Sequence, residues 1–351
     1  MALPLTSPPA TLCILRLSAV GDICHTLPVV RTLQQVWPET KLTWIIGKVE
    51  STLVDDIPDI EFIIFDKAKG FHAYRELHQQ MKGRHFDVLL HMQMSLRASL
   101  ASLLIPAEIR LGFDKQRAND LQWLFTNSRI ANQSKQHVMD SLFGFLKALG
   151  IIERRLEWNI PIPAAVSTEV NKLLPQKPFM VISPCSSMVY RNWHAEGYAQ
   201  VIDYAAKKYH LPTVLTGGPS GIELEYGEKI SRLCQHKPLN LIGQTSLKQL
   251  LAILQQANLL IAPDSGPAHM ATAVDTPVIG LYAATNPDRA RPYLSPELVI
   301  NRYPDAVYNK FGKPVDKVPW GSRIRDAGTM ERISTESVNA MLDQFMMTDP
   351  A

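Results

Sequence analysis

Short apolar runs alternate with amphipathic segments along most of the chain. Apolar runs predict buried strands at 11–17, 42–46, 61–65 and 86–90 in the first half, and at 179–183, 213–216, 259–262 and 277–282 in the second. Apolar residues at helical spacing predict helices at 27–36, 96–104, 195–209, 247–256 and about 334–346. This alternation is typical of βαβ units, so we expect an α/β fold with mostly parallel sheets.

Four prolines between residues 161 and 178, together with a polar stretch without periodicity, predict a linker between the two halves. A length of 351 residues also favours two domains over one. The expected domains are 1–165 and 166–351, each doubly wound and Rossmann-like. For the C-terminal helix at about 334–346, packing back on the N-terminal domain is an open option.

Composition narrows the class of protein. Hydrophobic residues make up 46% of the chain and charged residues 20%, which is typical of a globular protein. The formal net charge of +3 is too small to indicate a nucleic-acid partner. The apolar runs stay below the roughly 18 residues that span a bilayer, and the N-terminus lacks a signal-peptide pattern. We therefore expect a cytoplasmic protein that can touch a membrane from that side.

Several well-known motifs are absent from the sequence. There is no G-x-G-x-x-G after the first strand, which disfavours a dinucleotide oxidoreductase, and no Walker A, H-E-x-x-H or G-x-S-x-G motif. There is no Asp-x-Asp, the metal-chelating device of many nucleotide-sugar transferases, so neither a metal nor a cofactor is expected. The cysteines form no C-x-x-C pair, and reduced packing residues are favoured over a zinc site or disulfides for Cys13, Cys24, Cys185 and Cys234.

The loop after the first strand carries the first candidate chemistry. Residues 18–28 leave a strand and open a helix, where Gly21 allows close backbone approach and free N–H groups suit an anion or a sugar. Asp22 has two interpretations, a helix N-cap or a general base that points into a cleft. His25 is either a polar residue at the start of the helix or a ligand.

A second loop, residues 263–271, follows the apolar run at 259–262. Ser265 and Gly266 can present N–H groups to a phosphate, while Asp264 can orient the loop or accept from a hydroxyl. His269, one turn into the following helix, faces the same place. The alternative is a capped helix with a structural histidine.

Three further strand ends in the second half carry small or anion-binding residues. After the first of these strands, Ser186, Ser187 and Arg191 suit a phosphate. A carboxylate after Gly218, either Glu223 or Glu225, can bind ribose hydroxyls. Thr285 closes another strand end, and Trp193 is interpreted as a packing residue. Several such loops at the carboxyl ends of parallel strands indicate a nucleotide-diphosphate site.

Together these segments resemble the bacterial lipopolysaccharide heptosyltransferases of glycosyltransferase family 9. The resemblance rests on Leu-Ser-Ala-Val-Gly-Asp-Ile-Cys-His-Thr-Leu-Pro at 17–28 and Pro-Asp-Ser-Gly-Pro-Ala-His at 263–269. Arg-Asn-Trp at 191–193 and Gly-Gly-Pro at 217–219 lie between these two segments, and Ala-Thr-Asn-Pro at 284–287 lies after them, in the same order as in the family. Segments 44–50 and 112–115 look most like heptosyltransferase I, in particular the branch that acts on phosphorylated single-Kdo acceptors.

The resemblance implies a GT-B fold, in which two Rossmann-like domains face one another across a cleft. It implies inverting, metal-independent transfer of heptose from ADP-L-glycero-D-manno-heptose to Kdo–lipid A at the cytoplasmic face of the inner membrane. Asp22 matches the catalytic base, and Arg191 stands where heptosyltransferase I usually has Lys. The implied donor-binding residues are Ser186, Ser187, Arg191, Glu223, Asp264, Ser265, Gly266, His269 and Thr285.

The acceptor is anionic, so basic residues of the N-terminal half are candidates for its phosphates. Lys67, Lys69, Arg75, Lys115 and Arg117 are each either such contacts or ordinary solvated cations. The candidate acceptor-binding residues are Gly21, His25, Lys67, Lys69, Arg117 and His137. The alternatives are a heptosyltransferase II type, a GT-B enzyme with another donor, and a non-catalytic envelope-assembly protein.

Overall fold

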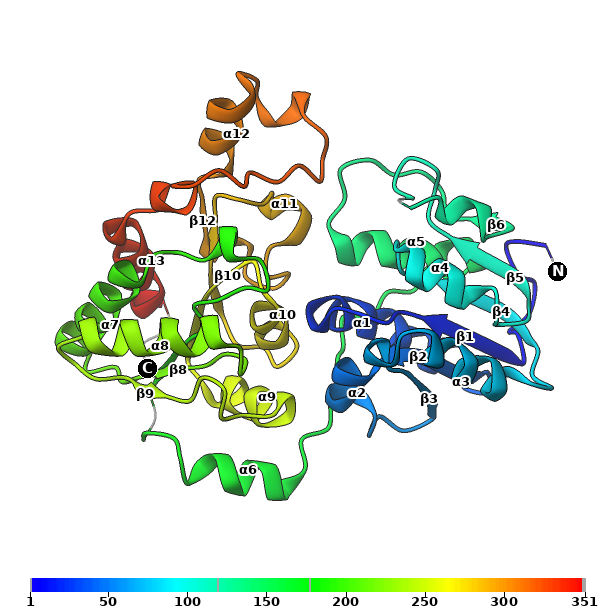
Figure 1. Cartoon of the computed structure of the whole chain (residues 1–351), viewed down its shortest axis with the longest axis horizontal. Coiled ribbons are helices and arrows are strands. Elements are labelled where there is room, and N and C mark those ends of the chain that lie inside the picture. The colour runs from blue at the N-terminus through cyan, green and yellow to red at the C-terminus, as the bar shows by residue number, and fades with distance from the viewer. Residues whose placement is uncertain (1, 119, 177, 349–351) are drawn as a thin grey trace. The chain divides into compact units, whose positions relative to one another are not determined.

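The computed structural model describes residues 2–118, 120–176 and 178–348. The chain forms two compact units that meet in sequence between Pro161 and Ile162, a few residues before the predicted boundary. Each unit contains a six-stranded sheet with helices on it (Figure 1). All the strand pairs within both sheets are parallel, so the predicted α/β fold with two doubly wound domains is confirmed.

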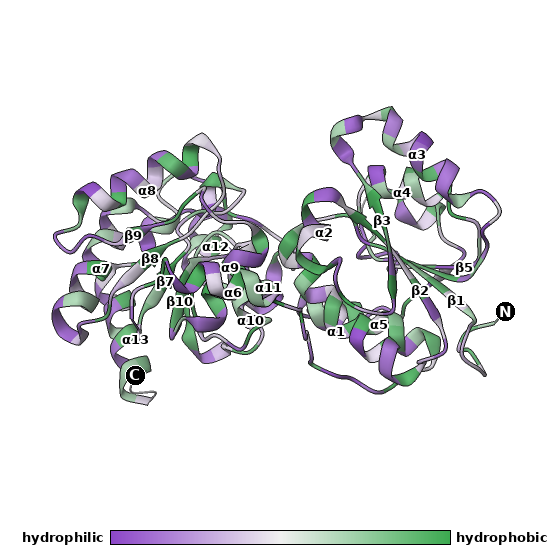
Figure 2. Cartoon of the chain, turned by 90° about the horizontal axis from the view of Figure 1, so that it is seen from below, coloured by the Kyte–Doolittle hydropathy of each residue, from purple (hydrophilic) through white to green (hydrophobic). Residues whose placement is uncertain are grey.

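The first unit is built on a sheet with the order β3-β2-β1-β4-β5-β6. Residues 12–15 of the central strand β1 are fully buried, which explains why its sequence is continuously apolar rather than alternating. The hydrophobic colouring of the strands in Figure 2 shows the same feature. The strands are β1 (Thr11–Leu15), β2 (Lys41–Gly47), β3 (Ile60–Phe65), β4 (Phe86–His91), β5 (Ala107–Gly112) and β6 (Ser128–Arg129). The helices are α1 (Val20–Val36), α2 (Lys48–Val54), α3 (Phe71–Met81), α4 (Leu96–Ser102) and α5 (Val138–Leu149), with short 3₁₀ turns at Lys67–Lys69 and Gln122–Leu124.

The second unit repeats the plan with the strand order β12-β11-β10-β7-β8-β9. Its strands are β7 (Met180–Ile182), β8 (Thr213–Leu215), β9 (Leu239–Asn240), β10 (Leu259–Pro263), β11 (Val278–Tyr282) and β12 (Val299–Asn301). Its helices are α6 (Ala164–Asn171), α7 (Ala195–Tyr209), α8 (Gly221–Leu233), α9 (Leu247–Gln256), α10 (Gly266–Thr272), α11 (Pro287–Ala290), α12 (Tyr303–Phe311) and α13 (Thr335–Thr348). The 3₁₀ turns are Val189–Arg191, Pro296–Leu298, Val315–Lys317 and Met330–Arg332.

Two sequence-based expectations about this unit concern its first and last helices. The predicted linker contains the helix α6, which packs on α9. Because Val170 is its one buried side chain, the apolar residues of this helix show little helical periodicity in the sequence. The C-terminal helix α13 packs on α7, β11 and β12 and buries Val338, Leu342 and Phe345 in the core of its own unit. The buried face of this helix is therefore covered within its own unit.

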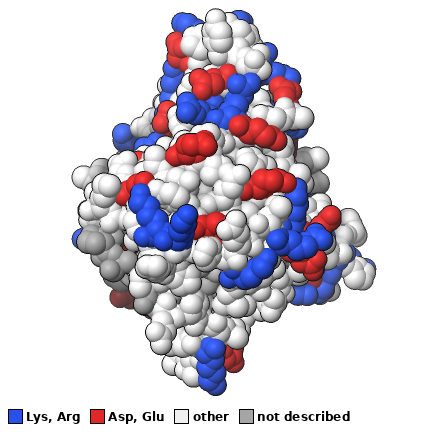
Figure 3. All heavy atoms as spheres, turned by 90° about the vertical axis from the view of Figure 1, so that its left-hand side faces the viewer, with Lys and Arg blue, Asp and Glu red and all other residues white. Residues whose placement is uncertain are grey.

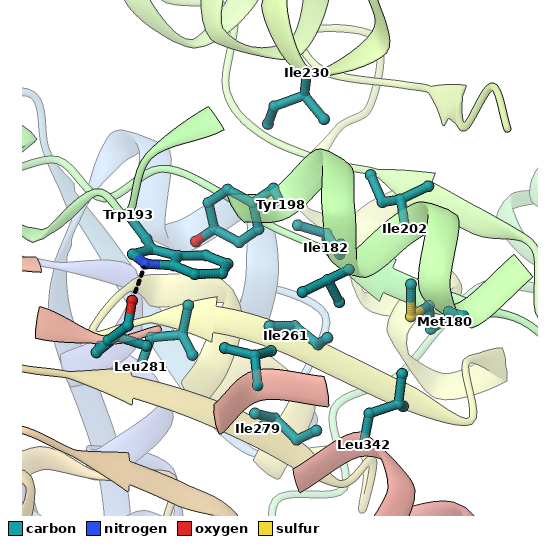
Figure 4. Close-up of a cluster of buried hydrophobic side chains, with 14 of the residues drawn as sticks. Met180, Ile182, Trp193, Tyr198, Ile202, Ile230, Ile261, Ile279, Leu281 and Leu342 are labelled. Atoms are coloured by element: carbon teal, nitrogen blue, oxygen red, sulfur yellow. Dashed lines mark hydrogen bonds between the residues drawn. The ribbon is translucent and has the colours of Figure 1, made fainter. Parts of the chain in front are cut away.

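Trp193 anchors the core of the second unit, as the sequence predicts. Its ring is fully buried beside Tyr198, and its indole N–H donates to the carbonyl of Ile333 at 2.9 Å (Figure 4). The four cysteines are buried and free, which confirms that they are packing residues. Burial raises the pKa of the Cys24 thiol to about 12, so it stays protonated at neutral pH.

One face of the molecule is mixed in charge. On the face of the molecule drawn in Figure 3, lysine and arginine side chains lie among aspartates and glutamates, in line with the small net charge.

A hollow of about 480 Å³ is lined by residues just before β11, in and before the 3₁₀ turn 296–298 and at the end of α13. This hollow lies at the amino-end edge of the second sheet, opposite the edge where the candidate site residues follow the strands. Within the described part of the chain, the helices are too short or too polar to cross a membrane.

Candidate active site

In each unit the candidate residues follow the carboxyl ends of parallel strands. In the first unit they come after β1, β3, β5 and β6, and in the second after β7, β8, β10 and β11. Because parallel strands end at one edge of a sheet, each set shares an edge, the usual place for a ligand in such folds. The structure therefore brings most of the predicted residues together within their own unit.

The loop between β1 and α1 is held rigidly by a residue that sequence analysis missed. Gln93, which follows β4, accepts from the backbone N–H groups of Leu17 and Ser18 at 2.6 and 3.1 Å. Its amide donates in turn to the Ser18 hydroxyl at 3.2 Å. This fixes the path of the chain into α1 and so the direction of the first side chains of that helix.

Asp22 lies in the first turn of α1. The N-cap is Ala19 rather than Asp22, but one oxygen of the Asp22 carboxylate accepts from the Ala19 N–H at 3.0 Å. The other oxygen forms an ion pair with the Arg16 guanidinium at 2.6 Å, and the side chain is 36% exposed. A carboxylate has about four acceptor positions, so both oxygens keep capacity for a further proton donor. The capping contact and the role of a base are thus compatible.

Arg16, the partner of Asp22, was not among the predicted residues. It follows β1 directly, is nearly buried, and donates to the carbonyl of Met92 as well as to Asp22. Its own carbonyl accepts from the Trp44 indole at 3.2 Å. The available signal was a cation inside the apolar run 11–17, immediately before the candidate loop.

The two predicted histidines of the first unit come together in its interior. His25 on α1 and His137 at the N-cap of α5 are both buried, and their rings meet edge to face at 5.5 Å. The Nδ1 atom of His137 accepts from the N–H of Met139 at 3.1 Å. This contact gives His137 a capping role in addition to any contact with an acceptor.

The predicted basic residues differ in how far their charges are already engaged. Lys67 is exposed in the turn after β3, whereas Lys69 pairs with Glu76 at 2.7 Å. Arg117 pairs with Asp114 and donates to Gln136, Ser141 and the carbonyl of Ala131. Arg117 therefore ties together the loops after β5 and before α5, and Lys67 has the most accessible charge of the three.

A buried glutamate stands near Asp22. Glu50 on α2 is 6% exposed, and burial raises the pKa of its carboxyl, with a smaller raising effect from the negative charge of Asp22 and a lowering effect from Lys67. Gly47 ends β2 and is the N-cap of α2. Its N–H donates to the carbonyl of Leu17 at 3.0 Å, and a Cβ on Gly47 would lie 2.3 Å from that carbonyl oxygen. The β2–α2 junction thus requires glycine to approach the loop of Asp22.

In the second unit, Asp264 is the centre of a polar cluster. Arg191 reaches its carboxylate at 3.2 Å and its carbonyl at 3.1 Å, and His269 lies 3.9 Å away. Burial alone would raise the pKa of the Asp264 carboxyl, but hydrogen bonds from His269 and Thr285 and the charge of Arg191 hold it below its usual range. The cluster joins the loops after β7, β10 and β11, as the sequence predicts.

The remaining predicted donor residues have individual environments. Ser186 is half-buried and its N–H donates to Asn192 at 2.8 Å, whereas Ser187 is exposed. Ser265 is the N-cap of α10 and Gly266 is its first residue. Within the described residues, no group of three or more His, Cys, Asp or Glu side chains could hold a metal ion.

The carboxylates after Gly218 lie on the helix α8, where the sequence analysis expected a loop. Glu223 accepts from the Gly218 N–H at 2.7 Å and from the Ser220 hydroxyl at 3.1 Å. A Cβ on Gly217 or Gly218 would lie 2.9 Å from an oxygen of this carboxylate, so the two glycines make room for it. Glu223 therefore orders the loop after β8, while Glu225 is exposed.

The chain is similar to known proteins in sequence and in fold. Residues 74–317 match the family model described as glycosyltransferase family 9 (heptosyltransferase). The chain belongs to glycosyltransferase family 9. It is therefore a glycosyltransferase, as its sequence indicates.

Relatives of this family resemble the chain over nearly its whole length. It is 41% identical over 338 residues to the Haemophilus influenzae protein named lipopolysaccharide core heptosyltransferase OpsX, covering 95% of this chain and 96% of that one. A family 9 glycosyltransferase from Veillonella parvula has a TM-score of 0.80 at 21% identity, with 99% of both chains covered. The Escherichia coli heptosyltransferase WaaC with ADP has a TM-score of 0.69 at 18% identity, covering 95% and 97%. The two solved structures support the GT-B fold.

Proposed function

We propose that this family 9 enzyme transfers L-glycero-D-manno-heptose from ADP-heptose to Kdo of the lipopolysaccharide inner core. The reaction is inverting and metal-independent, and the enzyme is of the heptosyltransferase I type. The name of the Haemophilus relative supports this substrate class, and so does the ADP with which WaaC was solved. The observation that carries the mechanism is the Asp22 carboxylate, which is oriented by Arg16 and Ala19 and still partly exposed.

Asp22 acts as the general base. It takes the proton from the attacking Kdo hydroxyl as that oxygen bonds to the anomeric carbon of the heptose, while the bond from that carbon to ADP breaks on the opposite face. Because Arg16 and the Ala19 N–H hold the two oxygens in place, the carboxylate needs little reorganisation before it accepts the proton. A positioned base of this kind contributes roughly 10²–10⁴ in rate.

The second unit binds the donor and stabilises the departing diphosphate. Arg191 supplies a guanidinium, whose planar N–H groups suit phosphate oxygens, and the hydroxyls of Ser186, Ser187 and Ser265 are further donors. Asp264 orients Arg191 rather than the sugar, since its carboxylate is buried among Arg191, His269 and Thr285. Glu223, which is held in the first turn of α8 by the Gly218 N–H, and Gly266 complete the wall of this site.

The acceptor binds to the first unit at the edge that carries Asp22. Lys67 has an exposed charge for the acceptor's phosphates, and Lys69 can exchange its partner Glu76 for them. Gly21 and His25 line the start of α1, and Arg117 and His137 hold the neighbouring loops in place.

We also propose that the enzyme works at the cytoplasmic face of the inner membrane, where a lipid-linked acceptor would be found. Leu96 and Leu100 on α4 of the first unit and Leu103 at its C-cap form an exposed apolar stripe, with exposed Leu121 and Leu124 in the loop that reaches the start of this helix. Co-sedimentation with anionic phospholipid vesicles tests this. The double variant Leu100→Ser/Leu103→Ser should bind vesicles less than wild type, and equal binding would contradict this contact surface.

The decisive experiment is incubation with ADP-heptose and Kdo–lipid A that bears either one phosphorylated Kdo or two Kdo units, followed by mass spectrometry. The gain of one heptose on the Kdo acceptor is expected. Transfer only to an acceptor that already carries heptose would indicate a heptosyltransferase II type, and binding of UDP in place of ADP would indicate another donor. Acceptor binding without donor turnover would favour a non-catalytic envelope-assembly protein.

A further inference from the structure

A short segment between α12 and α13 runs along the carboxyl edge of the second sheet. The N–H of Ile324 donates to the carbonyl of Ala284 at 2.9 Å, and Thr285 and Arg323 form an antiparallel bridge. In Figure 1 this segment belongs to the orange-red stretch that leads from α12 to α13. It therefore lies beside the loop after β11, whose Thr285 also contacts Asp264.

The side chains of this segment divide between two faces. Ile324 is 2% exposed and packs into a cluster with Tyr303, Ala306 and Val307 of α12. In an extended segment, successive side chains point to opposite faces, so Arg323 and Arg325 both lie on the face away from this cluster. Both are exposed, and within the described residues neither side chain has an ion pair or hydrogen bond. Their charges are thus available to a ligand.

Arg325 extends this face to the polar cluster around Asp264. Its guanidinium carbon lies 5.6 Å from the centre of the Tyr190 ring, and the guanidinium carbon of Arg191 lies at the same distance from that ring. Arg191 in turn contacts Asp264 at 3.2 Å. Two arginines from distant parts of the sequence therefore approach one aromatic ring at the donor edge, and the Asp264 carboxylate is already paired with Arg191.

Three proton donors at the same place lack a partner. The Tyr190 hydroxyl, the Nε of Arg191 and the hydroxyl of Ser265 are buried without a hydrogen bond in the structure, and Ser265 is only 7% exposed. Buried donors without a partner are uncommon in folded proteins, and an anionic ligand is one partner that would satisfy all three of these groups. Donors together with two guanidinium groups match an anion with several acceptor oxygens.

We propose that Arg325 is a second guanidinium ligand for the diphosphate of the nucleotide sugar, where it contacts the second, sugar-linked phosphate and works with Arg191 beside the Tyr190 ring. This assignment rests on the proposed ADP-heptose donor and adds a residue outside the recognised motifs. The diphosphate gains negative charge as its bond to the sugar breaks, so a second cation stabilises the leaving group as well as the bound donor. Arg323 lies on the same face, two residues before Arg325, where it pairs with Thr285.

The test compares Arg325→Gln and Arg325→Lys with Arg232→Gln by calorimetric binding of ADP and AMP. Arg232 is a matched control because it is exposed in the last turn of α8, which begins after β8 and so ends at the opposite edge of the sheet. Loss of one charge-assisted contact should weaken ADP binding by about tenfold or more in Arg325→Gln. AMP binding should change by less than about twofold, because its single phosphate is held without Arg325, and Arg325→Lys should be intermediate.

Other outcomes would overturn the assignment. Unchanged ADP binding in Arg325→Gln, or an equal loss for AMP and ADP, would show that Arg325 does not contact the second phosphate. Equal weakening in Arg232→Gln would indicate a general effect of surface charge. If wild type bound neither ADP nor AMP, the proposed donor would be wrong as well, which separates failure of the proposed function from failure of this inference alone. Equal melting temperatures of the three variants ensure that only folded proteins are compared.

Discussion

The two units use the same pair of residue types in opposite ways. Each has an Asp–Arg pair beside a central strand, at the edge where the strands end. Asp22 pairs with Arg16 at 2.6 Å and remains 36% exposed, while Asp264 pairs with Arg191 at 3.2 Å and is 11% exposed. Asp264 also has His269 and Thr285 as partners, whereas the second oxygen of Asp22 accepts from the N–H of Ala19.

This difference separates a carboxylate that can react from one that organises its surroundings. A partly exposed carboxylate with unused acceptor positions can take a proton from a substrate. A buried carboxylate surrounded by donors is satisfied already, and its removal leaves buried cations without a partner. The same side chain therefore supports chemistry in one unit and placement in the other, and four predictions can sharpen or break this contrast.

The largest expected effect is on catalysis by the first pair. Asp22→Asn should lower kcat by roughly 10²–10⁴, because the amide cannot accept the proton. ADP binding, measured by calorimetry, and the melting temperature should stay close to wild type, since the amide keeps an oxygen that can accept from the Arg16 guanidinium. Wild-type kcat in Asp22→Asn would disprove the assignment of the base.

The second pair should matter most for stability. Asp264→Ala should lower the free energy of unfolding by roughly 3–5 kcal/mol, because Arg191 and His269 would lose their buried anion. Thermal unfolding should show this as a fall in Tm on the order of 10 °C. The control is Glu196→Ala, which removes an exposed pair with Lys229 and should cost less than about 1 kcal/mol. Equal effects in both variants would remove the contrast.

Arg16 should have a smaller, catalytic effect. Arg16→Gln frees one oxygen of Asp22 to rotate, so kcat should fall by about tenfold, with Arg16→Lys intermediate. Steady-state kinetics should place the loss in kcat, with ADP binding unchanged. A loss in donor affinity at unchanged kcat would mean that Arg16 does not act through Asp22.

The smallest effect is on pH dependence. The pKa of Asp264 is lowered in the folded protein, so its contribution to stability is fully present above the unfolded value of about 4 and is lost as the pH falls through the lower folded value. The Tm difference between wild type and Asp264→Asn should therefore be constant from about pH 5 to 8 and shrink below about pH 4. A difference that grows on acidification would contradict the lowered pKa.

Where burial is continuous, the sequence predicts the elements well. The bounds of α7 and α9 match the predicted ranges, because their apolar faces pack on the sheet and leave a clear period. The helix α8 was missed because it buries only Gly227 and Ile230 and exposes Ile222 and Leu224, which obscures its pattern. Periodicity reports burial, so elements that bury little are hard to predict.

The candidate site shows the same division. The motif loops were identified by local composition, since small residues and turns after apolar runs are visible in any window. Arg16 and Gln93 were missed because their importance arises from contacts with residues elsewhere: Gln93 lies 75 positions from Ser18, and the Arg16 side chain reaches the carbonyl of Met92. No feature of the sequence selects Arg325, because its proximity to Tyr190 depends on the folded structure.

The sequence by itself determined the class of fold, the division into two halves and the loops in which polar chemistry is concentrated, because these follow from local patterns of burial and turn formation. Only the tertiary structure decided which aspartate stays accessible and which is enclosed, and which arginine accompanies each. Those outcomes depend on solvent exposure and on partners far apart in the chain, and both are properties of the packed molecule.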